Sequence, residues 1–214
     1  MRALIYVPIV HSEADLGSLA GELRQQFLET FGADAWARRR DGVEGMWGGL
    51  RARLLSLPIS LRRSRIYQDG LPVCGHELEI VHHLAASGSH NHQLLVELIE
   101  RGATLMGTED PQLLVRDYER LKRLVRAAED RTAEAILEEV RRDGEVILRE
   151  RDLFIARRID QTLAEGETGI LFLGLLHRVD ELLGGKLDIR HLIHNLPFGA
   201  DPLMELKERD GDGN

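Results

Sequence analysis

Two histidines directly follow apolar runs near opposite ends of the chain, and histidine binds metals and transfers protons near neutral pH. His11 follows the run ALIYVPIV at 3–10, and His177 comes shortly after the run GILFL at 169–173 and its neighbour Gly174. Both runs are typical of buried strands in a parallel sheet. Because ligands bind where the carboxyl ends of such strands meet, we expect both imidazoles to line one site at that edge. Taken alone, His177 could instead be a structural residue that caps the next helix.

Two carboxylates could complete such a site. Asp69 follows the β-prone run RIYQ at 65–68, and Glu109 follows the apolar run ATLM at 103–106. A carboxylate at a strand end can bind a metal or act as a general base. Each also has a structural explanation, since Asp-Gly turns are common and an acid ahead of the helix expected from Pro111 complements the helix dipole. The choice between Asp69 and Glu109 is open from the sequence.

An Arg-Asp pair, Arg151-Asp152, stands one turn before an apolar stripe at helical spacing. An arginine at a helix start opposes the helix dipole, so it needs a compensating partner. An anionic ligand or Glu109 would supply one.

Two other clusters are weaker candidates. The glycine-rich segment 42–49 lacks a following lysine with serine or threonine, so it does not have the spacing of a phosphate-binding loop. Several histidines lie within 82–92, but residues that are adjacent or two apart on a helix do not converge, so they form no zinc motif. Among them His92, at the start of a predicted helix, is the better candidate for the site.

The apolar pattern predicts a single α/β domain over 1–206. We expect a largely parallel sheet with strands near 3–10, 65–69, 103–107 and 169–174, covered on both faces by helices that include 43–57, 76–86 and 90–100. Interleaved charges predict a long helical region over 111–163, in which Gly144 is a candidate break. The segment 187–196 could be strand or helix. The polar tail 207–214 is predicted to be disordered.

Composition excludes several classes of protein. The 214 residues are 43% hydrophobic and 30% charged, which is ordinary for a soluble globular protein. The formal net charge of -8 argues against binding to nucleic acid or anionic membranes. Cys74 is the single cysteine, and no apolar run approaches the ~20 residues of a membrane span. We therefore expect a cytoplasmic protein that binds neither nucleic acid nor membranes.

The helical region 111–163 also predicts self-association. It contains more helix than a sheet of this size can cover, and its apolar residues, such as Leu121 and Val140, must be buried somewhere. A symmetric homodimer is the commonest way to bury them.

In chain order, these features resemble the TraB/PrgY, TIKI, ChaN and erythromycin-esterase superfamily. The most similar segment is RDLFIARRID…GILFLGLLH, which matches the family's Arg-Asp helix and its second Gly-x-x-His, here Gly174 to His177. The resemblance implies that His11 and His177 are metal-binding or catalytic, that Glu109 is their acidic partner, and that Arg151 binds an anion or the transition state. The first histidine lacks a preceding Gly-x-x. The family's acid often follows the second strand, where this chain has Asp69.

Two imidazoles and one carboxylate suit a divalent transition metal such as Mn, Co, Fe or Zn, whose bound water can become a nucleophile. A metal-free form is also possible, in which one histidine takes a proton from water and the carboxylate orients it. The leading hypothesis is a metal-dependent hydrolase that acts on a small-molecule or peptide substrate. The alternatives are a regulatory protein that binds a metal or small anion without turnover, and a protein that acts through its helical region while these polar groups are unconnected.

Overall fold

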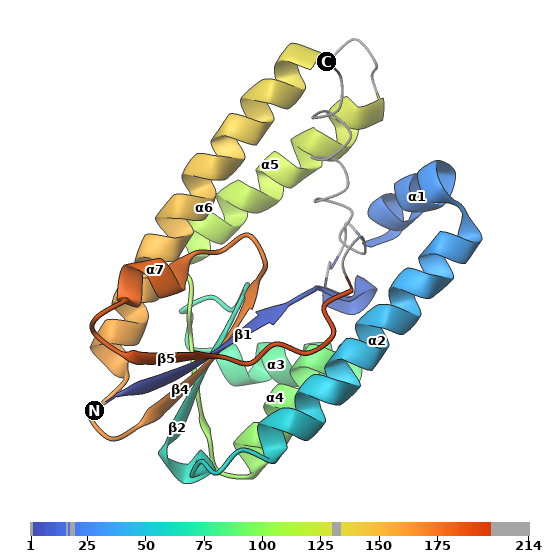
Figure 1. The fold of residues 1–214 in the computed structure, drawn as a ribbon. Helices are drawn as coiled ribbons and strands as arrows, with labels where there is room; N and C mark the ends of the chain where they lie inside the picture. Colours follow the sequence, from blue (N-terminus) through green and yellow to red (C-terminus); the bar gives the residue numbers. More distant parts are fainter. Residues whose placement is uncertain (1, 16, 18–19, 130–133, 198–214) are drawn as a thin grey trace.

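Five strands form one parallel sheet at the centre of the computed structural model, which describes residues 2–15, 17, 20–129 and 134–197 (Figure 1). In spatial order they are β3 (Thr104–Met106), β2 (Ser64–Gln68), β4 (Thr168–Gly174), β1 (Ala3–Ile9) and β5 (Asp188–His191). Every pairing between these strands is parallel, so the predicted α/β class is confirmed. The four predicted strands begin and end within one residue of the expected bounds, and β5 lies in the segment that the sequence left unassigned.

The two central strands, β1 and β4, end at the same level. They pair along their whole length, with Ile9 opposite Gly174. Both are apolar at successive positions because helices cover both faces of the sheet. As a result, the chain leaves β1 toward His11 and leaves β4 toward His177 from adjacent points on one edge.

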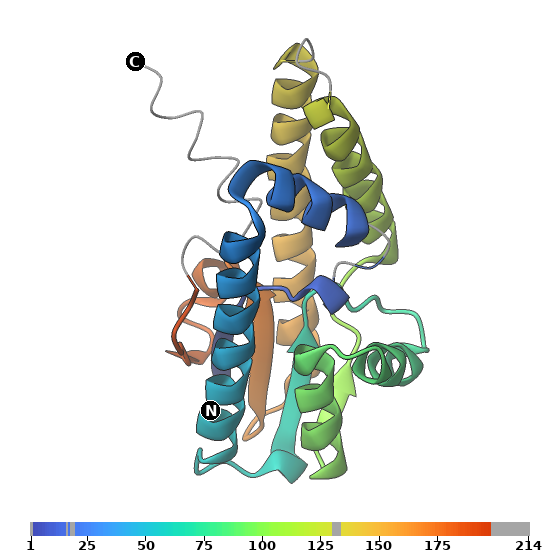
Figure 2. The same cartoon turned by 90° about the vertical axis from the view of Figure 1, so that its right-hand side faces the viewer.

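Three helices cover one face of the sheet: α2 (Ala33–Leu55), α3 (Glu77–Ala86) and α4 (His90–Glu100). Figure 2 shows α2 in blue and α4 in green in front of the strands. Val7 and Phe172 point into this core, where the ring centroid of Trp47 lies 6.5 Å from that of Phe172. The helix α1 (Ala20–Phe31) leads from β1 into α2.

Helix α2 begins at Ala33, well ahead of the predicted start at 43. The added turns are stabilised by contacts that sequence periodicity does not reveal. The Arg39 guanidinium lies 5.4 Å from the ring centroid of Trp36 and 5.9 Å from that of Phe27 on α1. These cation–π contacts bury the Arg39 side chain at the α1–α2 corner.

The glycine-rich segment 42–49 lies inside α2, where it makes room for the chain that follows β5. A Cβ atom on Gly49 would lie 1.8 Å from His194 Nε2. A Cβ atom on Gly42 would lie 3.2 Å from Pro197 Cβ. The glycines therefore allow a close approach of two chain segments.

On the other face lie α6 (Glu134–Thr162) and α7 (Val179–Leu183), whose apolar residues form a second core with alternate residues of the strands. Helix α5 (Pro111–Glu129) is antiparallel to α6. Two ion pairs show this orientation: Arg116 pairs with Glu150 at 2.7 Å, and Arg123 pairs with Glu139 at 3.1 Å. This helix pair extends beyond the sheet (Figures 1 and 2).

Gly144 does not divide the helical region as predicted. Helix α6 runs through it from Glu134 to Thr162, and the first helix of the region, α5, ends at Glu129. A Cβ atom on Gly144 would lie 3.0 Å from Arg120 Nη1, so this glycine accommodates a side chain of α5. The predicted tail 207–214 lies outside the described residues. No helix in the described part of the chain is long and apolar enough to cross a membrane.

Candidate functional site

All five predicted site residues lie in one cluster at the carboxyl edge of the sheet. His11 Nε2 lies 3.2 Å, and His177 Nε2 lies 3.6 Å, from Asp69 Oδ2. Arg151 Nη2 donates to Asp69 Oδ1 and to Glu109 Oε1, both at 2.8 Å. The hypothesis that these polar groups are unconnected therefore does not hold.

The backbone brings these residues together by two local devices. The His177 N–H donates to the Gly174 carbonyl at 3.1 Å, closing a tight turn directly after β4. The Asp69 N–H donates to the Phe172 carbonyl at 2.9 Å, which continues the β2–β4 ladder by one residue. His11 follows β1, the neighbour of β4, so three strand ends supply the centre of the cluster.

Asp69 is the carboxylate that faces both histidines. Its Oδ2 atom also accepts from the Gly174 N–H at 2.8 Å. Burial by itself would raise the pKa of Asp69, but the charge of His177 and hydrogen bonds from His11 and His177 hold that pKa well below its usual value. Asp69 is therefore ionised at neutral pH.

His177 is buried between two carboxylates. Its Nδ1 atom lies 2.5 Å from Asp152 Oδ1, and Asp152 Oδ2 accepts from the Arg178 N–H at 3.0 Å. Burial lowers the pKa of His177, but Asp69 and the hydrogen bond to Asp152 outweigh it and raise the pKa to about 9. His177 is therefore protonated at neutral pH, with one ring N–H toward each carboxylate.

Arg151 holds the acidic groups in place. Its Nε atom donates to Glu109 Oε2 at 2.6 Å, and its Nη1 atom donates to Asp117 Oδ2 at 2.8 Å. Together with the Nη2 contacts, the guanidinium binds three carboxylates. Burial by itself would lower the pKa of Arg151, but the hydrogen bond and ion pair with Glu109 and the charge of Asp69 outweigh it and raise that pKa above its ordinary value. In this geometry Arg151 is a positioning residue for Asp69.

Glu109 is also a positioning residue in this arrangement. Its side chain is fully buried, and both of its oxygens accept hydrogen bonds from Arg151. Its Oε1 atom accepts a further bond from the Gly70 N–H at 2.6 Å. Burial raises the pKa of Glu109 despite the contact with Arg151. The geometry thus answers the question left open by the sequence, because Asp69 and not Glu109 meets the histidines.

Gly174 allows the three central side chains to lie close to the end of β4. A Cβ atom at this position would lie 3.0 Å from Asp69 Oδ2, 3.5 Å from His11 Nε2 and 3.8 Å from His177 Cδ2. The three atoms nearest to that position therefore belong to Asp69, His11 and His177. Any larger residue would occupy it.

The donor atoms provide a test of the predicted three-ligand metal site. Glu109 commits both oxygens to Arg151, and Asp69 commits Oδ1 to Arg151 and Oδ2 to the Gly174 N–H. Among the described residues, no group of three or more His, Cys, Asp or Glu side chains is arranged to hold a metal ion. The described side chains therefore do not fit a three-ligand site for Mn, Co, Fe or Zn, and no step below depends on a metal.

A second polar network fixes the loop that carries His11. Asp15 Oδ2 accepts from the hydroxyl of Ser12 at 2.7 Å, and Asp15 Oδ1 accepts from Ser89 Oγ at 2.5 Å. Ser89 caps α4, and its Oγ atom lies 2.7 Å from His92 Nδ1. His92, the sequence-based alternative, therefore belongs to this network, where it contacts Ser89 and Asp15. The network ties the loop after β1 to the start of α4.

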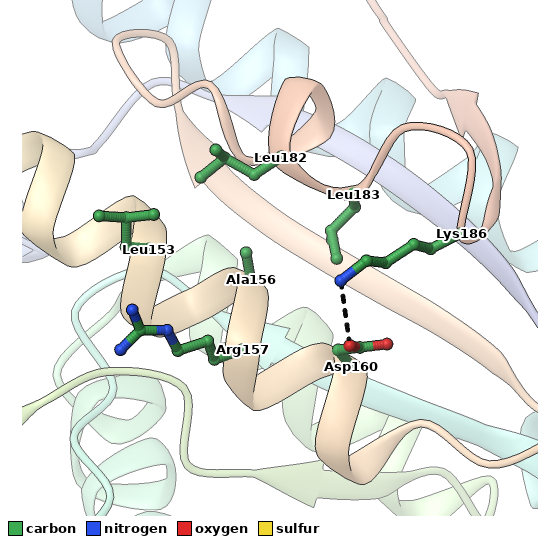
Figure 3. Close-up of a pocket in the computed structure, with 7 residues that line it drawn as sticks. All are labelled: Leu153, Ala156, Arg157, Asp160, Leu182, Leu183 and Lys186. Atoms are coloured by element: carbon green, nitrogen blue, oxygen red, sulfur yellow. Dashed lines mark hydrogen bonds and ion pairs between the residues drawn. The ribbon is translucent and has the colours of Figure 1, made fainter.

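Surface hollows lie elsewhere on the molecule. Figure 3 shows one of about 160 Å³ between α6 and α7, where Lys186 pairs with Asp160 beside Leu153 and Leu182. Another, of about 220 Å³, lies between α2 and α4. Neither is lined by the central side chains, so concavity alone would not have located the cluster.

Asp152 and Asp117 were not assigned a role from the sequence. Asp152 forms part of the Arg-Asp pair, so the pair itself was a usable signal, whereas nothing in the sequence pattern marks Asp117. Comparisons with protein-family models, with curated proteins and with solved structures found no match.

Proposed function

We propose that the protein is a hydrolase that cleaves an ester or amide bond by acid–base chemistry between His11, Asp69 and His177. The observation that carries the proposal is the position of Asp69 Oδ2, which lies 3.2 Å and 3.6 Å from the two Nε2 atoms. A histidine paired with a buried carboxylate is an arrangement that enzymes use to activate water or a hydroxyl group. The resemblance to the TraB and erythromycin-esterase superfamily is consistent with this choice.

Exposure separates the roles of the two histidines. The His11 side chain is 35% exposed, whereas that of His177 is 4% exposed. His11 can therefore meet both water and substrate, and Asp69 fixes the orientation of its ring. His177, buried and protonated between Asp69 and Asp152, does not meet the substrate and instead keeps Asp69 ionised and oriented toward His11.

The reaction follows from these roles. His11 takes a proton from water while the water oxygen forms a bond to the carbonyl carbon of the substrate. The bond from that carbon to the leaving oxygen or nitrogen then breaks, and His11 returns the proton to the leaving group. The products are a carboxylic acid and an alcohol or amine. We propose a small-molecule or peptide substrate.

A panel of chromogenic esters, amides and short peptides tests the proposal. We expect the wild-type protein to hydrolyse at least one class, and His11→Ala to lower kcat by roughly 10²–10⁴-fold, the usual contribution of a general base. His83→Ala, which changes an exposed histidine of α3, is the matched control and should keep full activity. The same assay after dialysis against a chelator tests the metal-free chemistry.

Three outcomes would contradict the proposal. Equal activity of His11→Ala and wild type would show that His11 is not the general base. Loss of turnover on chelation that Mn, Co, Fe or Zn restores would show a metal-dependent enzyme. Binding of a metal or small anion with no hydrolysis of any class would favour the regulatory alternative.

A further inference from the structure

We infer that Asp117 and Arg120 of α5 are positioning residues of the site, so that the packing of α5 on α6 regulates Asp69. The effect on turnover rests on the proposed function, whereas the effect on the geometry of Arg151 does not. Neither residue touches the histidines. Both act through Arg151.

A continuous series of contacts leads from the helix pair to Asp69. Arg120 Nε donates to Asp117 Oδ1 at 2.7 Å, and Asp117 Oδ2 accepts from Arg151 Nη1 at 2.8 Å. Arg151 Nη2 then donates to Asp69 Oδ1 at 2.8 Å. Asp117 and Asp69 each bind one neighbour through Oδ1 and the other through Oδ2. A displaced neighbour on one side therefore rotates the carboxylate and moves the neighbour on its other side.

Gly144 supplies the space that this series needs. Because it has no side chain, the Arg120 guanidinium can lie against α6, 3.0 Å from the place where a Cβ atom would stand. Arg120 is thereby held between its own helix and α6. The position of Asp117 consequently depends on how closely the two helices pack.

Burial distinguishes this series from the other ion pairs of the helix pair. The side chains of Asp117 and Arg120 are each 16% exposed, and that of Arg151 is 10% exposed. Arg123, one turn further along α5, pairs with Glu139 and Asp143 but is 49% exposed. Exposed ion pairs contribute little because water and salt screen them, whereas breaking a buried pair leaves an uncompensated charge. Arg151 would therefore reorient if Asp117 lost its charge.

The reorientation would reach the site in one step. Arg151 donates to Asp69 Oδ1, while Oδ2 is bound by the Gly174 N–H and the histidines. A turn of the guanidinium toward Glu109 would free Oδ1 and rotate the carboxylate that orients His11. A partner that spreads α5 from α6 would have the same effect.

Four variants test this inference: Asp117→Asn, Asp117→Glu, Arg120→Gln and, as the matched control, Arg123→Gln. The readouts are the Nε–H resonance of Arg151 in 15N spectra of the full chain, and kcat and KM on the best ester or amide of the substrate panel. We expect Asp117→Asn and Arg120→Gln to shift the Arg151 resonance and to lower kcat about tenfold with little change in KM, a size typical of residues that act through a neighbour. Arg123→Gln should leave both unchanged. Asp117→Glu should restore part of the loss.

The outcomes separate the two proposals. If the variants shift the Arg151 resonance but the wild-type protein hydrolyses no substrate of the panel, the positioning role is supported and the hydrolase is rejected. An unchanged Arg151 resonance in both Asp117→Asn and Arg120→Gln would overturn the inference, as would equal effects of Arg120→Gln and Arg123→Gln. If Asp117→Asn does not fold, Arg120→Gln tests the inference alone, because it keeps Asp117 and removes only the ion pair that holds the Asp117 carboxylate.

Discussion

His11 Nε2 lies 3.2 Å from Asp69 Oδ2, although 58 positions separate the two residues in the chain. The parallel order of β2, β4 and β1 creates this proximity, since all three strands end at one edge of the sheet. Asp69 is held from its other side by Arg151, so its orientation toward His11 is fixed by residues that take no part in proton transfer.

Gly174→Ala should abolish activity without unfolding the protein. The new methyl group would lie 3.0 Å from Asp69 Oδ2, closer than an ordinary contact, so it would displace the carboxylate that orients His11. We expect turnover to fall roughly hundredfold or more, the cost of displacing reacting groups by about 1 Å. Far-ultraviolet circular dichroism and a thermal melt provide the fold control. Full activity in Gly174→Ala would place the reaction elsewhere.

Two glycines of α2 should respond oppositely to alanine. Gly45 has no atom within 4 Å of a built Cβ, whereas a Cβ on Gly49 would overlap His194. We expect Gly45→Ala to raise the free energy of unfolding by roughly 0.4–1 kcal/mol through the unfolded state. Gly49→Ala should lower it by roughly 1–3 kcal/mol by overpacking. Urea denaturation measures both, and equal stabilisation by the two substitutions would contradict the packing of the segment after β5.

Asp15→Asn should remove a pH-dependent part of the stability. Burial would raise the pKa of Asp15, but hydrogen bonds from His92 and Ser89 lower it to about 2, below the ordinary value of 3.8. A lowered pKa means that the stabilisation is complete above about pH 4 and is lost as the pH falls through about 2. It corresponds to about 2 kcal/mol at neutral pH.

Unfolding experiments between pH 2 and pH 7 measure this effect. The difference between wild type and Asp15→Asn should shrink as the pH falls. Asp41→Asn, which alters an exposed aspartate paired only with Arg40 in the described structure, serves as the control and should show no such trend. A constant difference for Asp15→Asn would show that its carboxylate has an ordinary pKa.

The sequence predicted the strand ends well and the side-chain contacts incompletely. His11 and His177 were accessible because long apolar runs mark β1 and β4, and parallel strands must end together. The choice between Asp69 and Glu109 was not accessible, since it depends on which carboxylate Arg151 occupies. Arg151 binds both carboxylates, but it takes both oxygens of Glu109 and only one of Asp69, and this follows from the position of α6 against the sheet, which tertiary packing decides. The early start of α2 was missed for a similar reason, because Arg39 is stabilised by rings of two different helices.

Self-association through the helix pair stays a prediction. Val140, which the prediction named, is buried within the chain, but Val115 and Val146 are 62% and 54% exposed on α5 and α6, and a homodimer would cover them. Light scattering at micromolar concentration should show a dimer for the wild type and a monomer for Val146→Glu. Leu78→Glu, at an exposed leucine of α3, should stay dimeric. A wild-type monomer would contradict the prediction.

The protonation state of His177 tests the proposed site most directly. The imidazole can be followed by NMR from pH 5 to pH 11 in wild type and in Asp69→Asn. We expect a pKa of about 9 in the wild type, raised by Asp69 and Asp152 against the opposing effect of burial, and a lower pKa once Asp69 is neutral. A His177 that titrates near 6.5 in both proteins would contradict a cationic imidazole beside Asp69, and with it the proposed chemistry.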